Sequence, residues 1–212
     1  MVSDKNKHRF EYIWHLYNSN KTYDDLPFDK HVPCDPSLWQ FPEHLIEYHR
    51  LVFGLGHAAF KDKKILDIGC GISWYMGSME NTVKKYIGVD TDERCIKYAR
   101  TMSKLVDIDA EIKVASAEEI LCKADTIMML SVTHQMPNVK DILQRFDCEN
   151  IILDCWEDRN NIKMTDVISY LEDRGFTITE KKLYHYTDKK DLGEQQTYRG
   201  DRYILHFNRQ SD

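Results

Sequence analysis

The stretch Ile65-Leu66-Asp67-Ile68-Gly69-Cys70-Gly71-Ile72-Ser73 is an apolar run that leads into two glycines and then into the start of a helical pattern. Glycine has no Cβ, so these two positions allow a tight turn and a close approach between the backbone and a ligand. The first turn of a helix presents free backbone N–H groups, which can bind a polar or anionic group. The stretch therefore predicts a strand, a ligand-binding turn and a helix, in that order.

An acidic residue follows the two glycines at the distance that one helix and one strand require. Asp90 stands nineteen residues after Gly71, at the end of the apolar run 85–89, and one helix and one strand fit between them. A carboxylate at the tip of this second strand can accept hydrogen bonds from both hydroxyl groups of a ribose. A dinucleotide site is disfavoured, because its third glycine is replaced here by Trp74. Two alternatives stay open: a glycine turn that binds nothing, and an Asp90 that only caps the next helix.

Beyond this motif, short apolar runs alternate with helical patterns. The predicted strands are residues 64–68, 85–89, 111–114, 126–130 and 150–154, and the predicted helices are 73–82, 92–105, 117–122, 138–146 and 165–174. Fully apolar strands must be buried on both faces, so this alternation predicts a parallel sheet between two layers of helices. The last two extended runs, 176–186 and 202–207, have no helix between them, so one of them is expected to run antiparallel.

The segment before residue 64 has a different character. Four of the five prolines lie between residues 27 and 42, and they predict an irregular connector over 26–42. Apolar residues at helical spacing predict one helix before this connector and another over 42–55. We therefore expect a helical N-terminal cap over residues 1–60 and a ligand-binding domain over 61–212.

Composition narrows the class of protein. The 212 residues are 42% hydrophobic and 30% charged, which suits a folded core, and the net charge of −6 argues against a duplex nucleic-acid binder. No apolar run approaches the roughly 18 residues of a membrane span, and no secretory signal is recognisable. The six cysteines form no C-x-x-C pair. Because no secretory signal is recognisable, we expect reduced thiols and a cytoplasmic location. Because no apolar run is long enough, we expect no membrane partner. We expect a solvated helix face rather than a metal site from Glu43, His44, Glu47 and His49, and we expect no metal.

Taken together, these motifs resemble those of the class I S-adenosylmethionine-dependent methyltransferases. Residues 65–73 resemble the D-x-G-x-G-x-G motif, with Ser73 at the third glycine, and Asp90 matches the ribose-binding acid. Residues 114–118 resemble the adenine loop, where Ser116 replaces a frequent acidic residue, and residues 125–134 are similar to the fourth strand and the loop behind the cofactor. The resemblance implies a doubly wound α/β fold with a seven-stranded mixed sheet whose last strand is antiparallel.

The same resemblance implies the site residues. It assigns S-adenosylmethionine, as co-substrate, to a group of residues at the ends of four strands: Asp67, Gly69, Gly71, Asp90, Thr91, Ser116, Ala117, Leu130 and Ser131. His134 follows the fourth strand and is a candidate general base, although a histidine that only shapes the pocket is an alternative. Candidates for the acceptor pocket are aromatic or acidic: Trp14, Tyr17, Trp39, Trp156 and Glu157.

The expected activity is methyl transfer to a small molecule, because the chain is acidic and has no appended binding domain. Residues 131–134 do not form the Asn/Asp-Pro-Pro-Tyr/Phe tetrapeptide that marks many methyltransferases of planar amines, so that acceptor class is disfavoured. Two other classes stay open at this point. One is another S-adenosylmethionine-using enzyme, acting by aminopropyl transfer or cleavage, and the other is a non-catalytic S-adenosylmethionine-binding partner protein.

Overall fold

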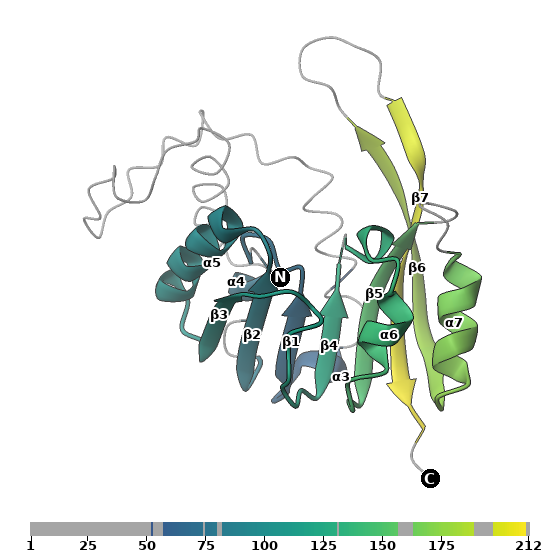
Figure 1. The fold of residues 1–212 in the computed structure, drawn as a ribbon, viewed down its shortest axis with the longest axis horizontal. Helices are drawn as coiled ribbons and strands as arrows, with labels where there is room; N and C mark the ends of the chain where they lie inside the picture. The colour runs from purple at the N-terminus through teal and green to yellow at the C-terminus, as the bar shows by residue number, and fades with distance from the viewer. Residues whose placement is uncertain are drawn as a thin grey trace.

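A seven-stranded mixed sheet forms the centre of the protein (Figure 1). The computed structural model describes residues 52, 57–73, 75–79, 82–130, 132–156, 163–188 and 197–210. The strand order is β3-β2-β1-β4-β5-β7-β6. The strands are β1 (Lys64–Ile68), β2 (Lys85–Asp90), β3 (Ala110–Val114), β4 (Thr126–Met129), β5 (Asn150–Trp156), β6 (Phe176–Asp188) and β7 (Thr197–Arg209). β1 to β5 are parallel, and β7 is antiparallel to both β5 and β6, which confirms the predicted fold class.

Helices cover both faces of this sheet. They are α3 (His57–Phe60), α4 (Met76–Met79), α5 (Glu93–Leu105), α6 (Val139–Leu143) and α7 (Met164–Glu172), with a short 3₁₀ helix, η3 (Thr133–Gln135). Alternate residues of a strand point to opposite faces. Ile65 accordingly packs in one core cluster with residues of α3, α4 and α5, whereas Leu66 packs in a second cluster with residues of α6 and α7. The sheet is therefore doubly wound.

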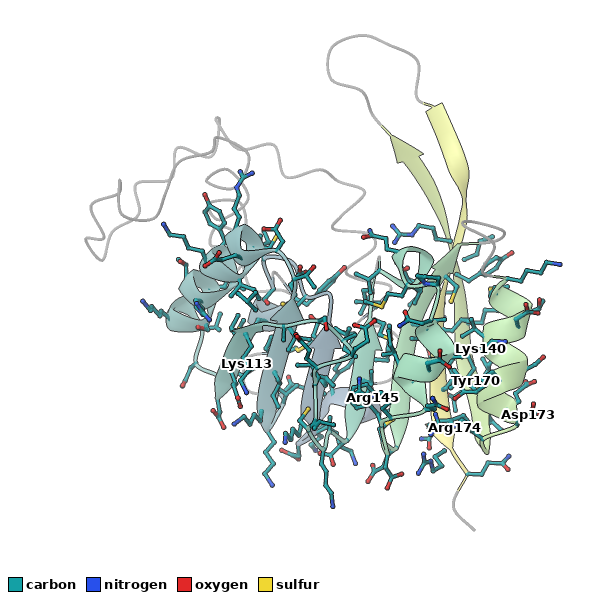
Figure 2. All side chains as sticks on the ribbon, viewed as in Figure 1. Lys113, Lys140, Arg145, Tyr170, Asp173 and Arg174 are labelled. Carbon is teal, nitrogen blue, oxygen red and sulfur yellow. The ribbon has the colours of Figure 1, made fainter. Side chains whose placement is uncertain are left out.

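Arg174, just after α7, connects the two helices of the second face (Figure 2). Its guanidinium donates hydrogen bonds to the carbonyl oxygens of Leu143 (2.8 Å) and Phe146 (3.4 Å), at and beyond the end of α6. The last carbonyls of a helix lack partners within the helix, so a cation there stabilises it. Arg174 and Lys140 also lie 5.8 and 5.9 Å from the ring centre of Tyr170. These contacts fix α6 and α7 against each other.

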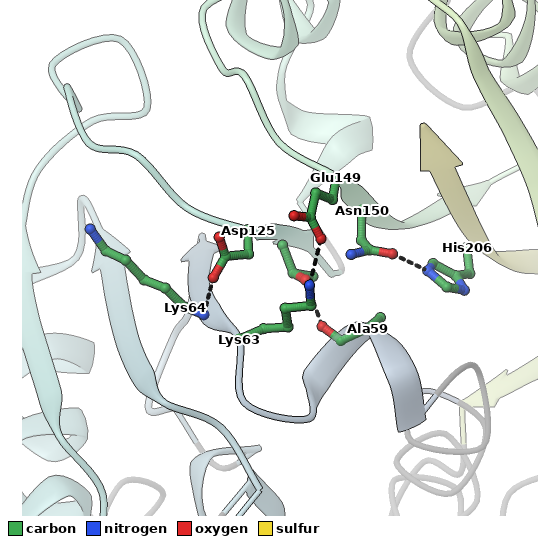
Figure 3. A network of polar contacts seen from close by, with 8 residues as sticks. Ala59, Lys63, Lys64, Asp125, Glu149, Asn150 and His206 are labelled. Carbon is green, nitrogen blue, oxygen red and sulfur yellow. Dashed lines mark hydrogen bonds and ion pairs between the residues drawn. The ribbon is translucent and has the colours of Figure 1, made fainter. Parts of the chain in front are cut away.

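Polar contacts link the amino ends of the strands (Figure 3). The backbone N–H of Lys64 donates to Asp125 Oδ2 at 2.8 Å, and the Lys63 ammonium pairs with Glu149. Thr126 Oγ1 donates to the carbonyl oxygen of Ala59. In parallel strands all amino ends lie at one edge of the sheet. These contacts therefore hold the edge opposite the glycine turn, and the carboxyl edge is left for a ligand site.

One predicted helix is wrong, and the final strands are longer than predicted. Residues 117–119 form a turn rather than the start of a helix over 117–122. The Arg145 guanidinium donates to the carbonyl oxygens of Ala117 and Glu118, so these carbonyls are bound by a side chain and not by a helical turn. β6 and β7 continue through the Asp188–Thr197 pair, so the paired backbone extends beyond the predicted runs 176–186 and 202–207.

Several expectations concern parts of the chain outside the described residues. The N-terminal segment with Trp14, Tyr17 and Trp39 belongs to this group, and the boundary at residue 60 stays a prediction. Val52 is described and is fully buried in the first core cluster. None of the described helices has the length and apolar character needed to cross a membrane. Within the described residues, no group of three or more metal-ligating side chains comes together.

Candidate cofactor site

The turn after β1 has three residues in the left-handed backbone region. The φ angles are 72° at Gly69, 52° at Gly71 and 55° at Ser73. The backbone N–H groups of Gly69 and Cys70 both donate to the carbonyl oxygen of Val89, at 2.8 and 3.0 Å, which ties the turn to the end of β2. Glycine adopts positive φ without the clash that a Cβ causes. Ser73 adopts it as well, so the serine at the motif's third glycine position keeps the glycine-like backbone.

The absence of a side chain matters at Gly69 and at Gly71 for different reasons. A Cβ on Gly69 would lie 2.2 Å from Val132 Cγ1, so glycine is required there for the loop after β4 to pack on the turn. A Cβ on Gly71 would meet no atom within 4 Å. Gly71 thus borders open space, and a ligand could approach its backbone directly.

A pocket of about 230 Å³ lies beside this turn, at the carboxyl ends of β1 and β4. It brings together four of the predicted cofactor residues and three others, namely Asp67, Gly69, Gly71 and Leu130 with Cys70, Tyr75 and Val132. Ligands bind open α/β sheets at this edge. Ser131 falls outside the described residues, and Asp90, Thr91, Ser116 and Ala117 are not among the residues that line the pocket.

Asp90 is tied to the glycine turn. Its Oδ2 accepts a hydrogen bond from the backbone N–H of Gly71 at 2.8 Å, and its Oδ1 accepts one from Asp92 N–H at 2.9 Å. The cap of α5 is instead Asp92, whose side chain accepts from the N–H groups of Arg94 and Cys95. Each carboxylate oxygen can accept a second hydrogen bond. Asp90 is half-buried and has that capacity left for a ligand.

Asp67 is a buried carboxyl group at the floor of the pocket. Its side chain is 1% exposed, and the Tyr86 hydroxyl donates to its Oδ2 at 2.6 Å. Burial raises the pKa of Asp67 to about 7; the hydrogen bond from Tyr86 opposes this rise, and the Asp90 charge adds to it. Sequence reasoning missed Tyr86. The available signal was Gly88 inside a strand, which marks a close approach by another group.

The predicted adenine loop lies next to Asp90. The backbone N–H of Ala115 donates to the carbonyl oxygen of Asp90 at 3.0 Å, so the loop after β3 starts beside the end of β2. Ser116 is partly exposed, and its N–H donates to Glu119 Oε2, whereas Ala117 is buried. Neither residue lines the pocket between β1 and β4, and their cofactor role stays a prediction.

The candidate acceptor side follows β4. His134 is the middle residue of η3, two residues after the pocket-lining Val132. The Thr133 hydroxyl donates to the carbonyl oxygen of Asp154, which attaches η3 to β5. Trp156 ends β5 at the same carboxyl edge, and Glu157 lies outside the described residues.

Comparisons with known proteins bear on this arrangement. A family model described as "Methyltransferase domain" matches residues 59–198. Magnesium protoporphyrin IX methyltransferase from Synechocystis PCC 6803, solved with bound SAM, superposes with a TM-score of 0.61 at 17% identity over 78% of this chain and 81% of that one. A putative methyltransferase from Bacillus halodurans gives 0.63 at 15% identity over 78% and 100%. The N-methyltransferase NodS from Bradyrhizobium japonicum gives 0.62 at 16% identity over 79% and 98%. The search of curated proteins gives no match.

The residues present fit S-adenosylmethionine. That molecule carries a cationic sulfonium, a cationic ammonium and two vicinal ribose hydroxyls, and the site offers the carboxyl groups of Asp67 and Asp90 beside an open glycine backbone. The family match covers well over half of the chain, and the strand order agrees with the structural relatives. The chain therefore belongs to the methyltransferase domain family, as a class I S-adenosylmethionine-dependent methyltransferase.

Proposed function

We propose that this methyltransferase acts on a small-molecule acceptor that binds over η3 and the end of β5. The observation that carries the proposal is the position of His134, in η3 directly after the pocket wall formed by Leu130 and Val132. η3 is attached to β5 through Thr133, so its backbone has a fixed place beside the pocket. The net charge of −6 weighs against a nucleic-acid acceptor.

The chain's own residues would bind and orient the reactants. Gly71 would let the cofactor approach the turn, Gly69 lets Val132 pack against it, and Asp90 would hold the ribose hydroxyls with its remaining acceptor capacity. S-adenosylmethionine supplies an electrophilic methyl group on sulfur. Positioning the acceptor atom in line with that methyl group supplies much of the rate, and His134 would take the proton that the acceptor loses. Trp156 and Glu157 would border the acceptor on the β5 side.

The acceptor class can be tested with S-adenosylmethionine that carries a labelled methyl group. The protein is incubated with a cell extract separated into small molecules, RNA and protein, and the label in each fraction is measured. We expect label in the small-molecule fraction, dependent on active protein. Label confined to RNA or to protein would refute the small-molecule acceptor.

The role of His134 has a separate test. Replacing it with alanine should lower turnover by roughly 10²–10⁴-fold, the usual range for general acid–base catalysis. The dissociation constant for S-adenosylmethionine should stay unchanged, because the proposed role of His134 is to take a proton from the acceptor and not to bind the cofactor. His134→Gln, which keeps a polar side chain of similar size, is the matched control for shape. A loss below tenfold in His134→Ala would leave His134 as a pocket-lining residue only.

A further inference from the structure

A hydrogen-bonded group of three buried side chains lies under the glycine turn. The Tyr86 hydroxyl donates to Asp67 Oδ2 at 2.6 Å and lies 3.2 Å from Ser73 Oγ. The tyrosine and the serine are 0% exposed, and the aspartate is 1% exposed. Tyr86 thus connects the first acid of the motif with the serine that stands at its third glycine position. Tyr86 itself does not line the pocket.

The strand pairing makes room for this tyrosine. In the register of β1 and β2, Gly88 stands directly opposite Asp67, and Tyr86 precedes it by two residues on the same face. A Cβ on Gly88 would lie 2.9 Å from Tyr86 Cε1 and 3.0 Å from Cys70 Sγ. The glycine therefore provides the space across which the Tyr86 ring reaches Asp67. The sequence Tyr86-Ile87-Gly88 encodes this contact.

We propose that Tyr86 is a positioning residue for S-adenosylmethionine binding, whose hydroxyl group fixes the Asp67 carboxyl group and holds it in its charged form. Asp67 lines the pocket, and the cofactor carries two cationic groups, so a charged Asp67 attracts it and a neutral one does not. The proposal concerns cofactor binding alone and does not depend on the identity of the acceptor.

Electrostatics explain why the hydroxyl is needed. Burial raises the pKa of Asp67 to about 7, and the nearby Asp90 charge adds to this rise. Within the part of the chain that the structure describes, the other ionisable groups that face Asp67 bring no positive charge: burial raises the pKa of both the Cys70 thiol and the Tyr86 hydroxyl, so both keep their protons. A hydrogen bond to the charged form lowers the pKa of a carboxyl group. The Tyr86 hydroxyl is thus the group that opposes neutralisation of Asp67 near neutral pH.

The test is a pH series of cofactor affinity for the Tyr86→Phe variant of the full chain. Dissociation constants for S-adenosylmethionine are measured calorimetrically from pH 6 to pH 9, and each is divided by the wild-type value at the same pH. This ratio cancels the titration of the cofactor itself. If the loss of the Tyr86 hydrogen bond raises the pKa of Asp67 by about one unit, the ratio should be about tenfold at pH 6 and should fall towards one at pH 9. The matched control is Tyr98→Phe, which alters a buried tyrosine of the same core cluster away from the pocket and should give a ratio near one throughout.

Two results would overturn the proposal. One is a Tyr86→Phe ratio near one at every pH, and the other is a ratio that is raised equally at every pH, which a merely structural role predicts. If Tyr86→Phe does not fold, Asp67→Asn decides instead. Asparagine cannot ionise, so the part of the wild-type pH dependence due to Asp67 should disappear in this variant. An unchanged pH profile in Asp67→Asn would refute the role of a charged Asp67 and, with it, that of Tyr86.

Discussion

Asp90 and Asp92 stand two residues apart and make different contacts, which gives a matched pair of variants. Asp90→Ala should weaken S-adenosylmethionine binding by roughly 10²–10⁴-fold, because two hydrogen bonds to a charged group are each worth about 1.5–3 kcal/mol. Asp92→Ala removes the cap of α5 and should lower the free energy of unfolding by about 1 kcal/mol, with cofactor affinity near normal. Calorimetric titration and thermal unfolding of both variants separate the two roles. Unchanged affinity in folded Asp90→Ala would contradict the ribose assignment.

Gly71 and Gly175 form a second matched pair. Both have positive φ, 52° and 80°, and a Cβ on either would meet no atom within 4 Å. Alanine should therefore cost each position a similar backbone strain, of about 1–3 kcal/mol. Only at Gly71 would the added methyl group enter the space beside the pocket, so Gly71→Ala should also weaken S-adenosylmethionine binding, by about tenfold or more. Equal cofactor affinities of the two variants, measured by titration, would show that the cofactor does not approach Gly71.

At the scale of elements, the sequence was informative where apolar patterns and glycine chemistry determine structure. β1 and β2 are buried runs between turn signals, and their bounds were predicted to within one residue. The predicted helix at 117–122 is wrong. Ala117 and Ile120 are buried at helical spacing, and this pattern favoured a helix, but the Ala117 carbonyl oxygen is bound by Arg145 instead of by a helical turn. The ends of the β6–β7 hairpin are polar and become strand only through pairing with each other. Within the candidate site, the motif predicted the glycine turn, and the cofactor role of Asp90 stays a prediction, whereas the Tyr86–Asp67 contact depends on which side chains meet across two strands.

The pairing of β5, β7 and β6 buries His206 and predicts a pH dependence of stability. His206 Nε2 lies 3.2 Å from Asn150 Oδ1, and its Nδ1 lies 2.9 Å from the oxygen of the Thr179 hydroxyl, which donates to the His206 carbonyl oxygen at 3.2 Å. Burial lowers the pKa of His206, against a smaller opposing effect of Glu180. Its contribution to stability is therefore complete above about pH 6.5, the unfolded pKa, and is lost as the pH falls towards the lower folded pKa.

Urea unfolding at pH 5, 6, 7 and 8 tests this sign. The free energy of unfolding of wild type, relative to His206→Gln at the same pH, should decrease as the pH falls below 6.5. The comparison at each pH is needed because Asp67, with its pKa raised to about 7, acts in the opposite direction: its stabilising effect grows as the pH falls below 7. A constant difference between the two proteins at all four pH values would show that His206 does not titrate with unfolding.

At the scale of the whole molecule, the amino edge of the sheet is held by polar contacts, whereas the carboxyl edge carries the pocket. The amino edge is held by contacts such as Lys63 with Glu149 and Lys64 with Asp125 (Figure 3). The carboxyl edge carries the pocket, and there the β6–β7 hairpin continues past the last pair of β5 with β7, Trp156 with Arg202 (Figure 1). Fixing one edge leaves the other free to vary in the segments that surround the acceptor. The hairpin backbone and the N-terminal segment are the candidates for that role.

The N-terminal segment gives the last prediction, because it separates cofactor binding from acceptor binding. Between residues 57 and 210 the described chain already holds seven strands with helices on both faces, and Val52 completes the first core cluster. Deleting residues 1–40 keeps all of these, so the truncated protein should still unfold cooperatively and bind S-adenosylmethionine about as tightly as the full chain. The deleted aromatic residues Trp14, Tyr17 and Trp39 are proposed to close the acceptor pocket, so turnover should fall by more than about tenfold, as for other closing segments.

Full-length protein with Trp14→Ala and Tyr17→Ala should show the same loss in turnover, with unchanged cofactor affinity. Full activity of the truncated protein would refute the cap. A loss of cofactor affinity as large as the loss of turnover would place the segment in the cofactor site instead, because a role in acceptor binding alone lowers turnover and leaves cofactor affinity unchanged.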